Sequence, residues 1–328
     1  MEPLQQIGIS LIQALQTLSP SLDGLMKFFT FLGRIEFYLL LIPFIYWTID
    51  KRLGMRALLV LIFIDSAGMA FKLLFHQPRP YWIGGVKPLA EEASYGIPST
   101  HASDSLAVGG YLAYHVKRTW FWVVLVILLF FIGLSRLFLG AHFPQDVLFG
   151  WLIGALVLWG FMRSVDRIAT WAKSKTLSMQ IAIAFGISIA LILIGLLLRL
   201  LISRTSDPAS WSAYASEART ISPFFTLSGA LFGSIVGYAL MRQSARFQTS
   251  GKWSTRVLRY LLGIIGVVLI YFGLDVVFGL ITPDETILGY ALRYIRYAAA
   301  TFWMTWGAPS VFLKIKLAEA ENYRGSHA

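Results

Sequence analysis

Long apolar runs, each close to the length of a membrane span, are the feature that most limits how this chain can fold. A helix needs roughly 20 apolar residues to cross a bilayer. Of the 328 residues 57% are hydrophobic and only 14% are charged, which is more apolar surface than a soluble domain of this length could bury. We therefore predict an all-α fold, a polytopic membrane helical bundle with about nine transmembrane spans. The runs occupy residues 36–49, 54–75, 101–116, 119–139, 146–165, 178–201, 221–241, 256–280 and 286–313.

Two shorter segments at the N-terminus have a different pattern. Residues 4–18 ("LQQIGISLIQALQTL") place apolar residues at helical spacing among glutamines, which is typical of an amphipathic helix on a membrane surface. Residues 22–32 can form a second such helix. We therefore expect three consecutive regions along the chain. They are N-terminal interfacial helices over 1–35, a core over 36–170, and an additional four-span membrane region over 178–316.

The loops between the runs separate by charge. If nine spans alternate, one side of the membrane receives most of the lysines and arginines, and the positive-inside rule assigns that side to the cytoplasm. We therefore expect an integral protein of a bacterial-type plasma membrane. The basic set comprises loops 50–56, 117–118, 163–175 and 242–259 and the tail from Lys314. The set expected to face outward comprises loops 76–100, 140–145, 202–220 and 281–285.

Charge and cysteine content exclude some classes of function. The net charge is +11, but the basic residues lie in short loops between apolar runs, so we expect no nucleic-acid partner. The chain has no cysteine, which excludes disulfides and thiolate metal sites.

Polar residues collect at the outward ends of the core runs, in three clusters. Taken alone, each cluster has a structural explanation: Lys72 can snorkel from a helix end, and Ser99 or Thr100 can cap a helix. His142 and Asp146, four residues apart, can be a surface pair. Only a shared site explains why all three lie on one face. The clusters are Lys72, Arg79 and Pro80 in "FKLLFHQPRP", Pro98 to His101 in "PSTH", and Ser135, Arg136, His142 and Asp146 in "SRLFLGAHFPQD".

The cations of these clusters suit a phosphate group. Lys72, Arg79 and Arg136 supply positive charge for a dianion, and arginine can bind two oxygens at once. The start of the run at 101–116 adds free backbone N–H groups, the positive end of a helix dipole and the Ser99 hydroxyl.

The histidines suit phosphoryl transfer. His142 can attack phosphorus as neutral imidazole, and Asp146 can hold its other N–H. His101 can protonate the leaving alkoxide and then activate water. We expect no cofactor and no metal, because the sequence has no carboxylate cluster suited to a metal ion.

At this point the three motifs resemble the signature motifs of the type 2 phosphatidic acid phosphatase family. Its superfamily includes lipid phosphatases, glucose-6-phosphatase and vanadium haloperoxidases. The resemblance covers roughly residues 22–165. It implies His142 as nucleophile, Asp146 as its partner and His101 as general acid, with a phosphate bound by Lys72, Arg79, Ser99 and Arg136.

Thr100 departs from the family pattern. Members usually have glycine between the serine and the histidine of the second motif, and the "PSTH" form is similar to members that act on sphingoid-base phosphates. We expect the Thr100 backbone N–H to bind the phosphate. The Thr100 side chain makes this binding position more crowded than glycine would.

These inferences predict a metal-independent phosphatase that removes phosphate from a membrane lipid phosphate or diphosphate at the outer face, through a phosphohistidine intermediate. Its expected partners are the lipid substrate and the bilayer. Phosphatidate, phosphatidylglycerol phosphate, an isoprenyl (di)phosphate and a sphingoid-base phosphate all remain open as substrates. One alternative is a lipid phosphotransferase that uses the same intermediate. Another is a lipid or solute transporter with a vestigial phosphatase core.

The second half has two further features. Asp275 lies in one apolar run, with Arg293 and Arg296 in the next, and we expect Asp275 to pair with one of these arginines. The stretch "SGALFGSIVG" spaces Gly229, Gly233 and Gly237 four apart, which favours close helix packing and leaves a homodimer open.

Overall fold

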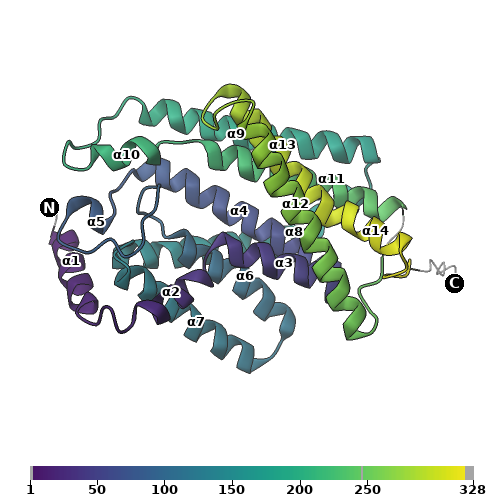
Figure 1. Cartoon of the computed structure of the whole chain (residues 1–328), viewed down its shortest axis with the longest axis horizontal. Helices are drawn as coiled ribbons and strands as arrows, with labels where there is room; N and C mark the ends of the chain where they lie inside the picture. Colours follow the sequence, from purple (N-terminus) through teal and green to yellow (C-terminus); the bar gives the residue numbers. More distant parts are fainter. Residues whose placement is uncertain (1–2, 245–246, 322–328) are drawn as a thin grey trace. The chain divides into compact units, whose positions relative to one another are not determined.

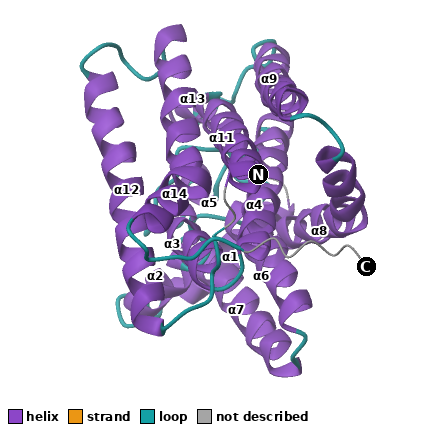
Figure 2. Ribbon diagram, turned by 90° about the vertical axis from the view of Figure 1, so that its right-hand side faces the viewer, coloured by secondary structure: helices purple, strands orange, loops and turns teal. Residues whose placement is uncertain are grey.

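The computed structural model describes residues 3–244 and 247–321. Figures 1 and 2 show helices joined by loops, and the described residues contain no β-strand, only an isolated bridge between Phe247 and Ala320. The predicted all-α class is confirmed. Arg246 and the part of the basic tail after residue 321 lie outside the described residues, as do residues 1–2 of the expected N-terminal region.

The chain divides into two compact units. The first contains the segments up to Tyr38, Val60–Asp166 and Leu193–Phe224, and the second contains Leu39–Leu59, Arg167–Ile192 and the residues from Phe225 onward. Each unit is built from three separate segments of the chain. The predicted regions 1–35, 36–170 and 178–316, in contrast, are consecutive. Those regions remain a proposal about the roles of the segments.

The helices of the first unit follow most of the expected runs. They are α1 (Pro3–Gln16), α2 (Asp23–Phe31), α3 (Ile35–Thr48), α4 (Lys51–Phe75), α5 (Pro80–Ile83), α6 (Thr100–Val116), α7 (Thr119–Phe138), α8 (Pro144–Lys173), α9 (Leu177–Ile202) and α10 (Ser212–Ala218). The helices α3, α4, α8 and α9 lie only partly in the first unit, and the larger part of α3 and of α9 belongs to the second.

The number of helices that can span a membrane is smaller than the nine expected. By length and composition the described residues hold six, and a seventh if the bent pair α2 and α3, at 48°, is one span. The remaining runs are helical but short: α3 has 14 residues and α6 has 17. At about 1.5 Å per residue these fall short of the roughly 30 Å of a bilayer core. The last run is divided among α13 (Ile287–Phe302), the π-helix η1 (Trp303–Gly307) and α14 (Ala308–Lys314). A count of nine is not confirmed.

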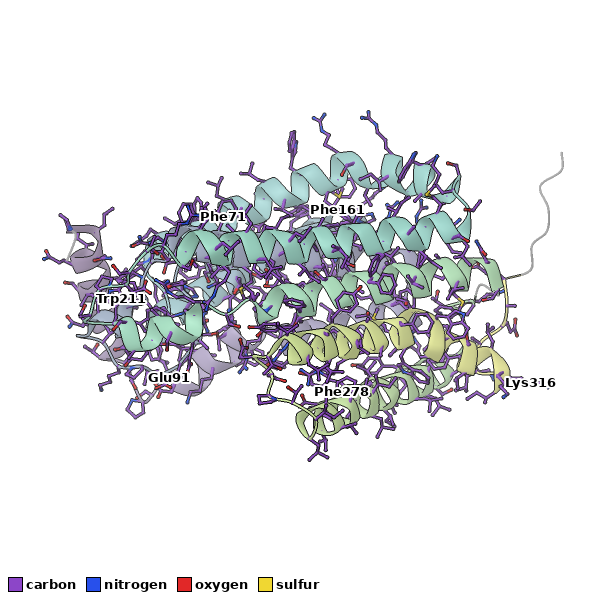
Figure 3. The ribbon with its side chains drawn as sticks, turned by 90° about the horizontal axis from the view of Figure 1, so that it is seen from above. Phe71, Glu91, Phe161, Trp211, Phe278 and Lys316 are labelled. Carbon is purple, nitrogen blue, oxygen red and sulfur yellow. The ribbon has the colours of Figure 1, made fainter. Side chains whose placement is uncertain are left out.

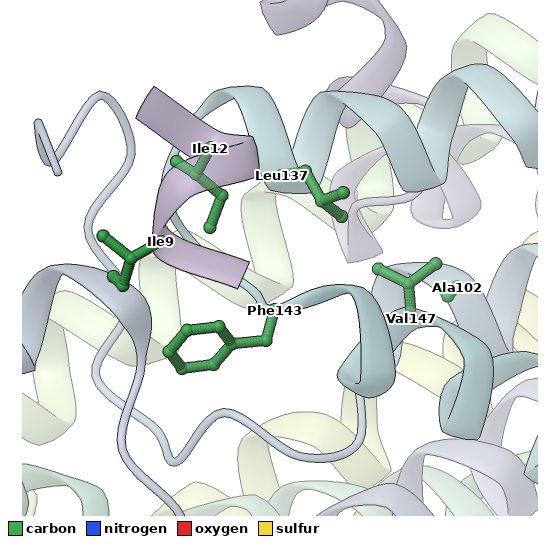
Figure 4. Packing of buried hydrophobic residues seen from close by; sticks show 6 residues of the cluster. All are labelled: Ile9, Ile12, Ala102, Leu137, Phe143 and Val147. Atoms are coloured by element: carbon green, nitrogen blue, oxygen red, sulfur yellow. The ribbon is translucent and has the colours of Figure 1, made fainter. Parts of the chain in front are cut away.

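Helix α1 is amphipathic, as expected, and its buried face packs on the protein. Figure 4 shows Ile9 and Ile12 packed beside Phe143 and Leu137 in one apolar cluster. The opposite face exposes apolar side chains such as Leu4, which is 66% exposed. One side of α1 therefore anchors on the first unit, and the other side stays free for a membrane surface.

A buried glutamine completes the docking of α1. The Gln16 amide donates to the carbonyls of Lys87, at 2.9 Å, and Phe138, at 3.0 Å, and its oxygen accepts the Lys87 N–H at 2.9 Å. Burying these groups is favourable only because each finds a partner. The contacts tie α1 to the loop after α5 and to the end of α7.

In the second unit, helices approach closely at glycines. It holds most of α11 (Ser222–Ser244), with α12 (Trp253–Gly279), α13 (Ile287–Phe302), the π-helix η1 (Trp303–Gly307) and α14 (Ala308–Lys314). A Cβ on Gly233 would lie 2.0 Å from the Ala298 carbonyl of α13, so no side chain fits there. The expected close packing thus occurs between α11 and α13 of one chain, and the homodimer stays a prediction.

The charges of α12 and α13 are paired. Asp275 forms an ion pair with Arg296, while Arg293 pairs with Asp284 at 2.5 Å. The Arg296 guanidinium also lies over the rings of Tyr271 and Tyr297, 5.2 and 5.4 Å from their centroids. The expectation that Asp275 pairs with one of the two arginines is confirmed for Arg296.

Candidate active site

The three polar clusters meet inside the first unit. Lys72 comes from the last turn of α4, Arg79 from the loop before α5, His101 from the first turn of α6, Arg136 from the last turn of α7, His142 from the turn after α7, and Asp146 from the first turn of α8. All six side chains are buried. Charged groups are rarely buried without partners, so their contacts define the site.

His142 lies between the Asp146 carboxylate and the Arg79 guanidinium. Its Nδ1 is 3.3 Å from Asp146 Oδ2, and its Nε2 is 3.1 Å from a terminal nitrogen of Arg79. Arginine can only donate, so Nε2 must be the unprotonated acceptor and Nδ1 carries the proton toward Asp146. The same Asp146 oxygen accepts the Phe143 N–H at 2.9 Å, which orients the carboxylate. This arrangement leaves the lone pair of Nε2 directed at the cationic side of the site.

A tight turn holds His142 in this position. The N–H groups of Ala141 and His142 both donate to the Arg136 carbonyl, at 3.0 and 3.2 Å. Gly140 adopts a φ of 73°, and a Cβ there would lie 2.7 Å from the Lys87 carbonyl, so this residue must be glycine.

The environment of His142 keeps its imidazole neutral. Burial lowers the pKa of His142 well below 6.5, and the nearby charges of Arg79 and Arg136 lower it further. A neutral imidazole is the form that can act as a nucleophile.

Two cations share one backbone acceptor. Lys72 Nζ donates to the Tyr95 carbonyl at 2.6 Å, and Arg79 donates to the same oxygen at 3.2 Å. Arg79 is held further by the Ser94 carbonyl at 2.5 Å and the Ser94 hydroxyl at 2.9 Å. The loop at 94–95 therefore brings two positive charges together beside His142.

Arg136 is held by an acid that the sequence analysis did not single out. It donates to Glu92 at 2.5 Å and to the Thr30 hydroxyl at 2.6 Å. The Tyr81 hydroxyl fixes the backbone of Glu92, donating to its carbonyl at 3.1 Å and accepting its N–H at 3.0 Å. Burial raises the pKa of Glu92, but the charges of Arg136 and Arg79 outweigh it and the net shift is downward. Glu92 is therefore an ionised carboxylate.

The start of α6 differs from the expectation in one respect. Ser99 occupies the N-cap position, as expected, but its side chain makes no capping hydrogen bond. Its hydroxyl is buried and lacks a partner within the described part of the chain, as do His101 Nε2 and Arg136 Nε. Buried polar atoms normally have partners. An anion bound at this position would supply them.

Close packing places His101 and Thr100. A Cβ on Gly150 of α8 would lie 2.6 Å from the Ser99 carbonyl, so the start of α6 closely approaches the second turn of α8. A Cβ on Gly33 would lie 3.0 Å from the Cβ of His101. The Thr100 methyl lies 3.0 Å from the position of a Cβ on Gly68 of α4. Thr100 therefore fills the gap between α4 and α6.

No group of three or more His, Asp or Glu side chains that could hold a metal ion occurs among residues 3–244 and 247–321. The expectations that no metal and no cofactor take part remain predictions about the reaction.

Comparisons with known proteins match both halves of the chain. Residues 53–169 match the model of the PAP2 superfamily, and residues 225–320 match a model described as PAP2 superfamily phosphatase, transmembrane extension. The first range contains every site residue named from the sequence.

Three individual matches illustrate the similarity. Human sphingosine-1-phosphate phosphatase 2 is 32% identical over 156 residues, 43% of this chain and 39% of that protein. Bovine glucose-6-phosphatase 3 is 28% identical over 185 residues, 48% of this chain and 53% of that protein. The crystal structure of a transmembrane PAP2-type phosphatidylglycerolphosphate phosphatase from Bacillus subtilis aligns with a TM-score of 0.44 and 24% identity, over 51% of this chain and 88% of that one. The chain thus spans about half the length, or less, of these two curated relatives.

Proposed function

The chain belongs to the PAP2 superfamily, and on that premise we propose that it is a metal-independent phosphatase of a membrane lipid phosphate or diphosphate, acting at the outer face through a phosphohistidine at His142. The observation that carries the proposal is the position of the His142 ring. Asp146 lies on its Nδ1 side and Arg79 on its Nε2 side.

The first step forms the phosphoenzyme. A phosphate that binds Lys72 and Arg79 lies on the Nε2 side of His142, where the lone pair attacks phosphorus. The bond between phosphorus and the lipid oxygen breaks, and His101 gives that oxygen a proton. Asp146 stabilises the positive charge that develops on the imidazole. The cations and the Ser99 hydroxyl stabilise the charge on the phosphate oxygens.

The second step releases phosphate. His101, now neutral, takes a proton from water as the water oxygen attacks phosphorus and the P–N bond breaks. Inorganic phosphate leaves, and His142 returns to its neutral form while His101 is protonated again. The site residues perform both steps as acid, base and nucleophile.

The lipid class is supported by where the site lies and by the relatives. The site residues sit at the ends of α4, α6, α7 and α8, which is where the headgroup of a membrane lipid lies when its tail remains in the bilayer. One relative is named for sphingosine 1-phosphate. The match over 225–320 to an extension of the same superfamily also supports a phosphatase over a separate carrier.

A substrate panel tests the proposal. The purified chain in detergent is incubated with phosphatidate, phosphatidylglycerol phosphate, farnesyl diphosphate, sphingosine 1-phosphate and glucose 6-phosphate, with and without EDTA. We expect release of inorganic phosphate from at least one lipid, unchanged by EDTA and absent in His142→Ala. Release from the sugar phosphate alone, phosphate found on an acceptor lipid instead of in solution, or loss in EDTA that magnesium restores would contradict the proposal.

A further inference from the structure

Residues 203–219 join α9 to α11 and include α10, and they lie outside both ranges that match the superfamily models. They nevertheless belong to the same compact unit as the site residues. Two sets of contacts join this segment to the active site: a polar chain of hydrogen-bonded side chains and a cluster of aromatic rings.

The polar chain begins at Arg219. Its side chain donates to Asp207 Oδ2 at 2.7 Å, and also to two backbone carbonyls: that of Ile202, the last residue of α9, at 2.8 Å and that of Thr205 at 3.1 Å. Asp207 in turn accepts from the Tyr95 hydroxyl, which lies 3.3 Å from both carboxylate oxygens. Asp207 is thereby fixed on one side and bonded to the active-site loop on the other.

Tyr95 carries this connection into the site. Its side chain is fully buried, and its carbonyl is the oxygen that Lys72 and Arg79 share. Burial and the Asp207 carboxylate raise the pKa of Tyr95 to about 12, so the hydroxyl remains a donor to Asp207 over the working range of pH. The positive charges of Lys72 and Arg79 repel each other. The Tyr95 carbonyl, held in place by the Tyr95 side chain, keeps the two groups together.

Aromatic rings hold the same two segments together. Trp211 is buried, and its ring lies 5.8 Å from Trp82 and 6.5 Å from Tyr95. Tyr214 stacks on Trp82 at 5.6 Å with an angle of 8°. Figure 3 labels Trp211, just before α10. Aromatic pairs of this kind add to the burial of apolar area.

We propose that residues 203–219 are a positioning segment for the phosphate-binding cations: Asp207, held by Arg219, anchors Tyr95, and the Tyr95 carbonyl orients Lys72 and Arg79. The inference rests on the proposed function in one respect, because it takes these two cations as ligands of the phosphate. Asp207 and Arg219 act through Tyr95 and are positioning residues.

The test compares Tyr95→Phe, Asp207→Ala and the double variant in the full chain in detergent. Each single change removes the bond between the two side chains and leaves the Tyr95 carbonyl in place. We expect the inhibition constant of vanadate to rise and kcat/KM to fall by about three- to tenfold, the range for one lost hydrogen bond. The double variant is expected to be no worse than the poorer single one, because both changes break the same link. Asp207→Glu is expected to restore part of the affinity.

Matched controls separate positioning from folding. Glu217 and Arg204 are exposed residues of the same segment, and Glu217→Gln and Arg204→Gln are expected to keep the wild-type vanadate constant. A segment that only supports the fold would lower the melting temperature of the Tyr95 and Asp207 variants and leave their vanadate constants unchanged. That result, or additive losses in the double variant, overturns the inference.

Vanadate binding measured directly by calorimetry makes the two proposals distinguishable. If the wild type binds vanadate and no lipid phosphate is hydrolysed, the proposed function fails and the variants still report on positioning. If the wild type binds neither vanadate nor inorganic phosphate, both fail.

Discussion

The two nitrogens of His142 have different partners, and this difference determines what the residue can do. Asp146 accepts a hydrogen bond from Nδ1–H, and Arg79 donates to Nε2, which must therefore carry a lone pair. The phosphate would take over the Arg79 donor as it binds, leaving Nε2 free to attack. In the proposed mechanism, His142 would thus already be in its attacking form before substrate arrives.

This arrangement predicts the acid side of the pH profile. Because burial lowers the pKa of His142, the neutral nucleophile persists as pH falls, and the acid limb of kcat/KM is expected below pH 6.5. The measurement uses two substrates whose phosphates titrate at different pH, so that a limb common to both belongs to the enzyme. A common acid limb at or above 6.5 would mean that His142 is protonated in the free enzyme.

Site residues that belong to the three motifs could be predicted from the sequence, and the residues outside the motifs that hold them in place could not. The family motifs identify Lys72, Arg79, His101, His142 and Asp146, and the structure brings all of them together. Glu92 and Tyr95 reach the site only through the path of the 76–99 loop, which depends on contacts distant in sequence. Ser99 occupies the N-cap position as predicted, but the predicted side-chain cap is wrong: its hydroxyl makes no capping hydrogen bond and has no partner among the residues that the structure describes.

Helices approach most closely where glycine replaces a side chain. Gly150 brings α8 onto α6 beside the site, and Gly233 brings α11 onto α13 in the second unit. The apolar runs predicted where these helices lie, because a membrane-spanning helix needs a long apolar run. The overcount arose because the short runs 36–49 and 101–116 were counted as spans, although α3 and α6, which match these runs, have only 14 and 17 residues.

The ion pair between Asp275 of α12 and Arg296 of α13 predicts how charge-removing variants change stability. The Arg296 side chain is 5% exposed and the Asp275 side chain 46% exposed. Asp275→Asn therefore leaves a buried guanidinium without its carboxylate partner. We expect this variant to lower the free energy of unfolding more than the double variant Asp275→Asn/Arg296→Gln does. The loss should be smaller than the roughly 3–5 kcal/mol of a fully buried pair, because Asp275 is half exposed.

Thermal unfolding in detergent measures these differences, and Arg293→Gln is the matched control because Arg293 pairs with Asp284 instead. Combining it with Asp275→Asn should give additive losses. Additivity in the Arg296 double variant as well would mean that the Asp275–Arg296 pair carries no coupling.

For the molecule as a whole, the charge of the loops predicts how it sits in the membrane. Lys87 lies in the 76–99 loop, on the side of the site, and Lys173 ends α8 among the basic residues. Both are exposed. The chain has no cysteine, so a single cysteine at either position is a unique label.

We expect an impermeant thiol reagent on intact cells to label Lys87→Cys and not Lys173→Cys, with the reverse in inverted vesicles. Labelling of both variants from one side, or of Lys173→Cys alone on intact cells, would contradict the orientation. The site would then act on lipids of the inner leaflet.

The central claim is that phosphate passes through His142, and rapid quench with a labelled nitrophenyl phosphate tests it most directly. This leaving group needs little protonation, so His101→Ala should still form the phosphoenzyme but hydrolyse it slowly. We expect an acid-labile, base-stable phosphoenzyme to accumulate in His101→Ala and none to form in His142→Ala. Trapped phosphate on His142→Ala, or turnover by that variant at the wild-type rate, would show that another residue is the nucleophile.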